Sequence, residues 1–182
     1  MYIYRLFILI SCVVTYLGLF NAAIITPAFS QAVATEKQDY ATVIMYHRFG
    51  ESRYPTTNVS IEQFESHLEF IAQGDYVVAP LIDIIETLQS GGVVKDKTVA
   101  ITVDDAYLSV YTQAWPRLKE YGFPFTIFVA TDPVDNNLRN YMSWDQIREL
   151  LENGVTIGSQ TKSHPHMHRL SPIKVEQELT LS

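Results

Sequence analysis

Cysteine is almost absent from this sequence. Its 182 residues include one, Cys12, which lies in an apolar stretch near the N-terminus. If residues 1–30 are removed after export, the remaining 152 residues contain no cysteine. This absence excludes disulfide bonds and thiolate metal sites from the mature chain, even in an oxidising compartment. The fold must then depend on its core, for which a single domain of this length is large enough.

Basic residues are also scarce. The sequence has 13 lysines and arginines against 20 aspartates and glutamates, a net charge of −7. Loss of Arg5 with the first 30 residues leaves 12 basic residues and a net charge of −8. Such a surface repels nucleic acids and anionic lipids and tolerates a neutral or cationic ligand. We therefore expect no nucleic-acid partner.

Charge is missing from most of the N-terminal region, since Arg5 is the only charged residue before Glu36. Residues 6–29 are almost wholly apolar, and residues 28–30 are Ala-Phe-Ser, with small residues at the first and third places. This pattern predicts a signal peptide over 1–30, a flexible lead over 31–40 and export to the periplasm or the extracellular space. Two alternatives remain open. The apolar run could stay uncleaved as a membrane anchor, since about 20 apolar residues span a bilayer. Leu-Ile-Ser-Cys at 9–12 also resembles a bacterial lipoprotein cleavage box.

Along residues 41–182, β-branched apolar runs alternate with helical patterns. The runs predict strands at 42–47, 76–78, 98–105, 125–130 and 155–159, the first and third of them buried. Capping signals and apolar stripes predict helices at 60–74, 80–91, up to 121, at 144–152 and from about 171. Pro116 must lie in the first turn of its helix or break it. This alternation predicts an α/β fold with a parallel sheet, either an open doubly wound sheet or a barrel.

Two carboxylates, Asp104 and Asp105, end the predicted strand 98–105. Ligands of parallel α/β folds bind at the carboxyl ends of strands, where the histidines after strand 155–159 must also lie. One aspartate could bind a divalent metal while its neighbour takes a proton from the metal's water. The alternative is that the pair caps the following helix.

Three of the five histidines, His164, His166 and His168, alternate within the segment IGSQTKSHPHMH at 157–168. Histidine commonly binds metals at neutral pH, so this cluster is a candidate metal site. For His166 alone, a solvated surface position is the better interpretation. His47 follows a strand and either packs or faces the same cleft, whereas His67 is expected to be structural or solvated. Tyr141 and Trp144 could form a sugar platform, but aromatic residues at a helix start are more often part of the core.

The segments AITVDDAYLSVYTQAWPRLKEYGFPFTIFVAT and MSWDQIRELLENGVTIGSQTKSHPHMHRLS, with the leading VIMYHRFG, resemble the polysaccharide deacetylases of carbohydrate esterase family 4. These enzymes carry the nodulation-protein-B homology domain, and the resemblance covers most of residues 42–182. It implies a distorted (β/α) barrel over residues 41–182. It also implies that Asp104 is the general base, and that Asp105 and His164 bind a divalent metal, zinc.

The sequence departs from this family at several places. Gln160 stands where the family has its first metal-binding histidine, and Ala106 replaces a glycine after the two aspartates. The third ligand would then be the carbonyl oxygen of Gln160, or His168, four residues after His164. The family's later motifs, including the Leu-X-His that supplies the general acid, are missing before Ser182, so we expect a C-terminally truncated domain.

The resemblance implies a metal-dependent hydrolase that removes N-acetyl groups from a polysaccharide containing N-acetylglucosamine (GlcNAc). The departures at Gln160 and Ala106 keep two alternatives open. One is a catalytically inactive, deacetylase-like carbohydrate-binding module. The other is a periplasmic metal-binding protein that uses the histidines of HPHMH.

Overall fold

The computed structural model describes residues 40–182, so the predicted signal peptide and nearly all of the predicted lead lie outside the described residues. The strands are β1 (Thr42–Tyr46), β2 (Arg48–Phe49), β3 (Asn58–Val59), β4 (Val77–Val78), β5 (Thr98–Asp104), β6 (Thr126–Val129) and β7 (Thr156–Ser159). The α-helices are α1 (Ile61–Gln73), α2 (Leu81–Gln89), α3 (Trp115–Glu120), α4 (Thr131–Asp135), α5 (Trp144–Glu152) and α6 (Pro172–Thr180). A π-helical segment, η1 (Val110–Ala114), precedes α3, and a 3₁₀ turn, η2 (Met167–Arg169), precedes α6.

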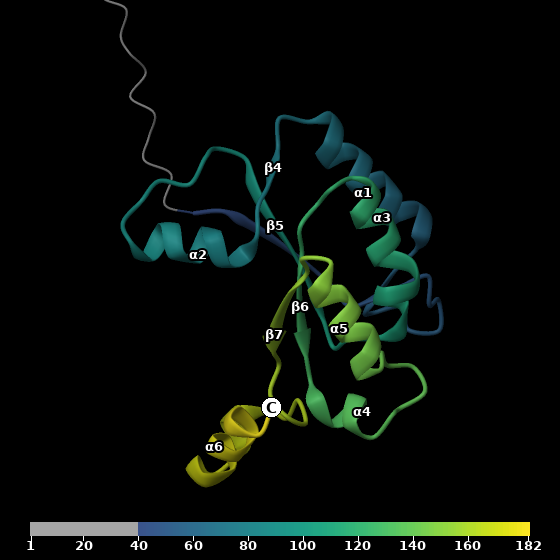
Figure 1. Cartoon of the computed structure of the whole chain (residues 1–182), viewed down its shortest axis with the longest axis vertical. Coiled ribbons are helices and arrows are strands. Elements are labelled where there is room, and N and C mark those ends of the chain that lie inside the picture. Colours follow the sequence, from purple (N-terminus) through teal and green to yellow (C-terminus); the bar gives the residue numbers. More distant parts are fainter. Residues whose placement is uncertain (1–39) are drawn as a thin grey trace, which may run out of the picture. The chain divides into compact units, whose positions relative to one another are not determined.

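Five strands form one parallel sheet in which β5 is central (Figure 1). Strand β5 pairs with β1, β4 and β6, and β6 pairs with β7. The register sets Asp104 opposite Phe128 and Val129 opposite Ser159, so β5, β6 and β7 end near the same edge. The parallel α/β class predicted from the alternation of elements is therefore confirmed.

The two faces of β5 pack against different helices. Ile101 and Val103 belong to the main core, which also includes buried residues of α1, α3 and α5. Ala100, on the opposite face, packs with residues of α2 in a smaller cluster, as expected for alternating strand residues. The prediction that β5 is buried is confirmed. The same prediction for β1 is wrong, because Val43 and Met45 are 50% and 60% exposed.

The capping signals in the sequence correspond to real helix starts. Ser60 and Gln63 form a complete capping box at α1, and Ser143 and Gln146 form one at α5. Pro116 lies in the first turn of α3, where a missing N–H costs nothing. Strands β2 and β3 and helix α4 were not predicted, because two-residue strands and a five-residue helix have too few residues for a periodic pattern.

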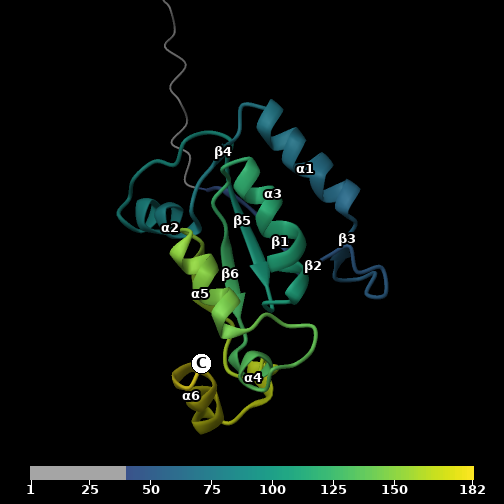
Figure 2. The ribbon, with the colours of Figure 1, turned by 45° about the vertical axis from the view of Figure 1, so that its right-hand side comes forward.

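Helices α4 and α6 lie at the carboxyl end of β6 and β7 in both views (Figures 1 and 2). Ala130 separates β6 from α4, and residues 160–171 connect β7 to α6. Helices therefore lie beside β7 at this end of the sheet. None of the helices within residues 40–182 is both long and apolar enough to cross a membrane.

Candidate functional site

The two aspartates are held by the buried end of β5. Asp104 is the last strand residue, and the backbone N–H of Asp105 donates to the carbonyl oxygen of Phe128 at 3.0 Å. Asp105 has φ 72° and Ala106 has φ 49°, so two consecutive residues in the left-handed region turn the chain sharply away. The side chains of Asp104 and Asp105 are only 14% and 13% exposed. Core packing thus fixes both carboxylates at the edge of the sheet.

Asp104 has a second titratable neighbour in His47, which directly follows β1. Its Nε2 lies 3.8 Å from Oδ2 of Asp104. Burial raises the pKa of the Asp104 carboxyl, His47 opposes this rise, and the charge of Asp105 adds to it. A carboxylate with a raised pKa is a better general base near neutral pH than an ordinary one. His47 therefore lies beside the carboxylates at the edge of the sheet.

Gln160 joins the two sides of the site. Its backbone N–H donates to the carbonyl oxygen of Val129 at 2.9 Å, which continues the pairing of β6 with β7 by one residue. Its side-chain Oε1 accepts a hydrogen bond from the backbone N–H of Asp105 at 2.9 Å. Its Nε2 lies 3.2 Å from Nε2 of His164. One amide thus bridges the strand that bears the carboxylates and the loop that bears the histidine.

His164 approaches the carboxylates from a tightly turned loop. Its Nδ1 lies 3.8 Å from Oδ1 of Asp105, and its side chain is 55% exposed. Thr161 and His164 have φ 65° and 53°, and the N–H of His164 donates to Oγ1 of Thr161 at 3.1 Å. The loop therefore brings the predicted metal ligand to the predicted carboxylate, although through strained backbone.

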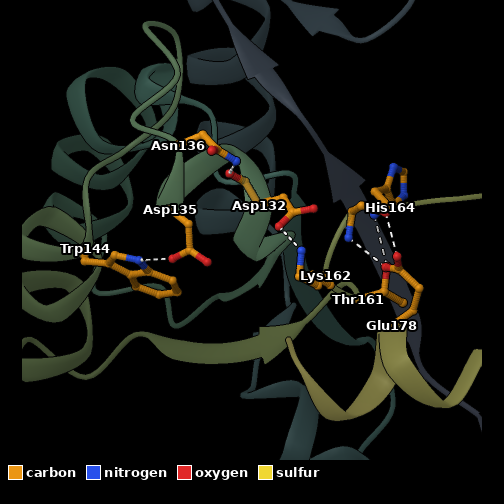
Figure 3. Close-up of polar contacts among 9 residues, drawn as sticks. Asp132, Asp135, Asn136, Trp144, Thr161, Lys162, His164 and Glu178 are labelled. Atoms are coloured by element: carbon orange, nitrogen blue, oxygen red, sulfur yellow. Dashed lines mark hydrogen bonds and ion pairs between the residues drawn. The ribbon is translucent and has the colours of Figure 1, made fainter. Parts of the chain in front are cut away.

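Polar contacts with α4 and α6 hold this loop (Figure 3). Lys162 forms an ion pair with Asp132 of α4, and this contact raises the pKa of Lys162. The carboxylate of Glu178, on α6, accepts hydrogen bonds from the backbone N–H and the hydroxyl of Ser163, both at 2.7 Å. These hydrogen bonds lower the pKa of Glu178. No sequence pattern indicates a role for Asp132 or Glu178, because each lies in a helix outside the loop that it holds.

The remaining predicted residues lie elsewhere. His168 is exposed in η2, where its Nε2 accepts from Nε of Arg169 at 3.3 Å and its ring lies 5.8 Å from that of His166. His67 lies near the hydroxyl of Tyr46, 3.0 Å from it, consistent with a structural role. Within residues 40–182, no group of three or more histidine, cysteine, aspartate or glutamate residues could hold a metal ion.

Aromatic residues beside the site were only partly anticipated. Arg48 is buried, and its guanidinium lies 3.3 Å from the ring centroid of Tyr107 and 3.9 Å from that of Tyr54. The ring of Tyr107 packs against that of Tyr141 with the centroids 4.8 Å apart and the planes tilted by 44°, and burial is the main cause that raises the pKa of Tyr107. Tyr141 thus packs against another tyrosine near Asp105, whereas Trp144 donates to Asp135 at 2.8 Å.

The family model described as polysaccharide deacetylase matches residues 91–182, just over half of the chain. The chain belongs to the polysaccharide deacetylase family. The recognition made from the motifs around Asp104 and His164 is therefore confirmed.

Named relatives and solved structures agree with this family. The chain is 26% identical over 147 residues to YxkH of Bacillus subtilis, covering 81% of this chain and 51% of that protein. It is 27% identical over 153 residues to the poly-beta-1,6-N-acetyl-D-glucosamine N-deacetylase of Staphylococcus aureus, covering 74% and 51%. The chain thus spans about half the length of these relatives.

Among solved structures, the deacetylase PplD of Streptococcus pyogenes, in complex with acetate, superposes with a TM-score of 0.71 at 22% identity, which shows the fold alone. That match covers 78% of this chain and 65% of PplD. IcaB from Ammonifex degensii superposes with a TM-score of 0.62 at 28% identity, covering 76% and 58%.

Polysaccharide deacetylases are generally metal-dependent, so the fit of a zinc ion to this site can be tested on its side chains. Catalytic zinc usually has three protein ligands. Asp105 and His164 are brought together and could provide two. At the third place, Gln160 uses its oxygen to accept from the Asp105 N–H and directs its NH₂ group to His164. An N–H donor repels a cation, so the side chains as they stand do not fit zinc.

Proposed function

We propose that this chain carries the base-bearing part of a polysaccharide N-deacetylase site. The observation that supports it is the position of Asp104, a nearly buried carboxylate at the end of β5 with a raised pKa and His47 beside it. In this proposal Asp104 takes a proton from a water molecule whose oxygen adds to the acetamide carbonyl carbon. The C–N bond then breaks, and the products are acetate and the free amine of the sugar, which receives the proton.

The substrate proposed is a polysaccharide containing GlcNAc. The staphylococcal relative is named for a β-1,6-linked polymer of this sugar, and the match to it covers 74% of this chain. The acidic surface of the chain suits a neutral or cationic polymer better than an anionic one. We propose that the chain acts after export, with residues 1–30 as its signal. Mass spectrometry of the protein from a culture tests this point, since cleavage after Ser30 leaves Gln31 as the first residue.

Binding of such a glycan without hydrolysis is the second candidate. The observation that favours it is the amide of Gln160, which presents N–H groups where the family has a metal-binding imidazole. The two candidates differ in product. Incubation of the full chain with a GlcNAc oligomer, followed by an assay for acetate, gives acetate if the first is right. Binding of the oligomer without acetate, measured by calorimetry, supports the second.

A further inference from the structure

The orientation of the Gln160 amide is set by its partner. Oxygen and nitrogen of an amide are easily exchanged when their partners are ambiguous, but a backbone N–H can only donate. The N–H of Asp105 lies 2.9 Å from the Gln160 side chain, so the atom that faces it is the carbonyl oxygen. The NH₂ group must then point the other way, into the space between the carboxylates and His164.

One group in that space can accept an amide proton. Nε2 of His164 lies 3.2 Å from Nε2 of Gln160. If Nε2 of His164 accepts, its neutral ring carries the proton on Nδ1, which faces Asp105 at 3.8 Å. The uncharged amide therefore satisfies an imidazole nitrogen that could otherwise bind a cation.

Turning the amide to offer its oxygen to a metal has a clear cost. The turn would leave the Asp105 N–H without Oε1 and would set that oxygen against Nε2 of His164. The Asp105 N–H would keep only its hydrogen bond to the carbonyl oxygen of Phe128, and the NH₂ group of Gln160 would face this N–H, donor against donor. If Gln160 provides no ligand, only Asp105 and His164, whose side chains lie 3.8 Å apart, remain as strong ligands for zinc.

We propose that the Gln160 amide takes the place of the divalent ion in this chain, so that the site assembles without zinc. The amide links the backbone of Asp105 to His164, the two residues that an ion would otherwise draw together. This inference does not depend on the proposed hydrolysis, because it is tested by measuring the affinity of the chain for zinc.

The test compares zinc binding by four forms of the full chain, each freed of metal by a chelator and titrated calorimetrically. The forms are the natural chain, Asp105→Asn, Gln160→His and the double variant Gln160→His/Asp105→Asn. We expect Gln160→His to bind zinc at least about 100-fold more tightly than the natural chain, since even outer partners of a metal site change affinity by 10–100-fold. The double variant should lose this gain, which locates the new site at Asp105.

The Asp105→Asn form separates this site from zinc held by the exposed histidines at 166 and 168. If the natural chain and Asp105→Asn bind zinc with the same affinity, the zinc is bound at another site, and this result supports the inference. Tight binding by the natural chain that Asp105→Asn abolishes would overturn it, as would a Gln160→His form with no gain. Acetate release is measured in parallel on a GlcNAc oligomer. Its absence from all forms counts against the proposed hydrolysis and leaves the zinc result unaffected.

Discussion

The two halves of the site are held by different means. The half that carries Asp104 continues from β5, whose residues are buried between α1, α3 and α5 on one face and α2 on the other. The half that carries His164 is a loop with left-handed residues, and it is held by the ion pair of Lys162 with Asp132 and by the hydrogen bonds that Glu178 accepts from Ser163. Core packing therefore positions the carboxylates, whereas contacts near the surface position the histidine. The two halves should respond differently to substitution.

The largest expected effect belongs to the carboxylate half, in the change Asp104→Asn. If Asp104 is the general base, acetate release should fall about 10²–10⁴-fold, because this is the usual contribution of a positioned base. Asparagine keeps the size and the hydrogen-bonding capacity of the side chain, so the fold should remain. Circular dichroism checks the fold. An Asp104→Asn form with unchanged acetate release would remove Asp104 from the proposed role.

The same variant tests the raised pKa of Asp104, whose main cause is burial. A raised pKa means that the folded chain binds the proton more tightly than the unfolded chain, so the ionised carboxylate costs stability above the folded pKa. This cost disappears as the pH falls below the ordinary value of 3.8. We therefore expect Asp104→Asn, in chelator-treated protein, to unfold at a higher temperature than the natural chain at pH 7. The difference should vanish in acid.

The next effect concerns the core that supports this half. Ile101 is 1% exposed in the middle of β5, and Ile101→Ala should lower the free energy of unfolding by about 2–5 kcal/mol. Ile173→Ala in α6 is the matched control, because Ile173 is 68% exposed, and it should change that free energy by less than about 0.5 kcal/mol. Denaturant titration measures both. Equal losses would mean that α6 shares the stability of the core.

This contrast also explains what the sequence could predict. The strand before Asp104 was found because apolar β-branched runs record burial, and α1 and α5 because their capping boxes are local. The exposure of β1 could not be predicted, since it depends on what lies beside Val43 and Met45 and not on the residues themselves.

The same limit applies to the site. The proximity of Asp105 and His164 was predictable, because parallel strands end at one edge of the sheet and the family motifs include both residues. The direction of the Gln160 amide was not predictable, because it depends on the backbone N–H of Asp105, 55 residues away in the sequence. The sequence left Gln160 and His168 as alternative ligands. In the structure Gln160 contacts His164, and those assignments as metal ligands stay predictions.

A smaller and local effect is expected in the histidine half. Glu178→Gln should weaken both hydrogen bonds from Ser163, because a neutral amide is a poorer acceptor than a carboxylate. Amide hydrogen exchange of Ser163 should become faster, while the midpoint of global unfolding stays nearly constant. Glu176→Gln, an exposed position in the same helix, is the control. If both variants exchange alike at Ser163, Glu178 does not hold the loop.

A small effect on stability is expected at Ala106, in the turn that follows the two aspartates. Ala106 has φ 49° and is fully buried, and its carbonyl oxygen accepts from the N–H of Met142 at 3.0 Å. A left-handed conformation costs an alanine roughly 1–2 kcal/mol, and part of this gain is lost because glycine has more freedom in the unfolded chain. Ala106→Gly should therefore raise the free energy of unfolding by about 0.5–1 kcal/mol.

Ala130 provides the opposite case for the same change. It is also buried at the end of a strand, but its φ is −82°, which suits any residue. Ala130→Gly should lower the free energy of unfolding by about 0.5–1 kcal/mol, since only the entropy of the unfolded chain and a lost methyl group remain. Denaturant titration of the two variants compares them directly. Destabilisation of both would mean that the packing of the Ala106 methyl group outweighs its strain, and that alanine is favoured at this position.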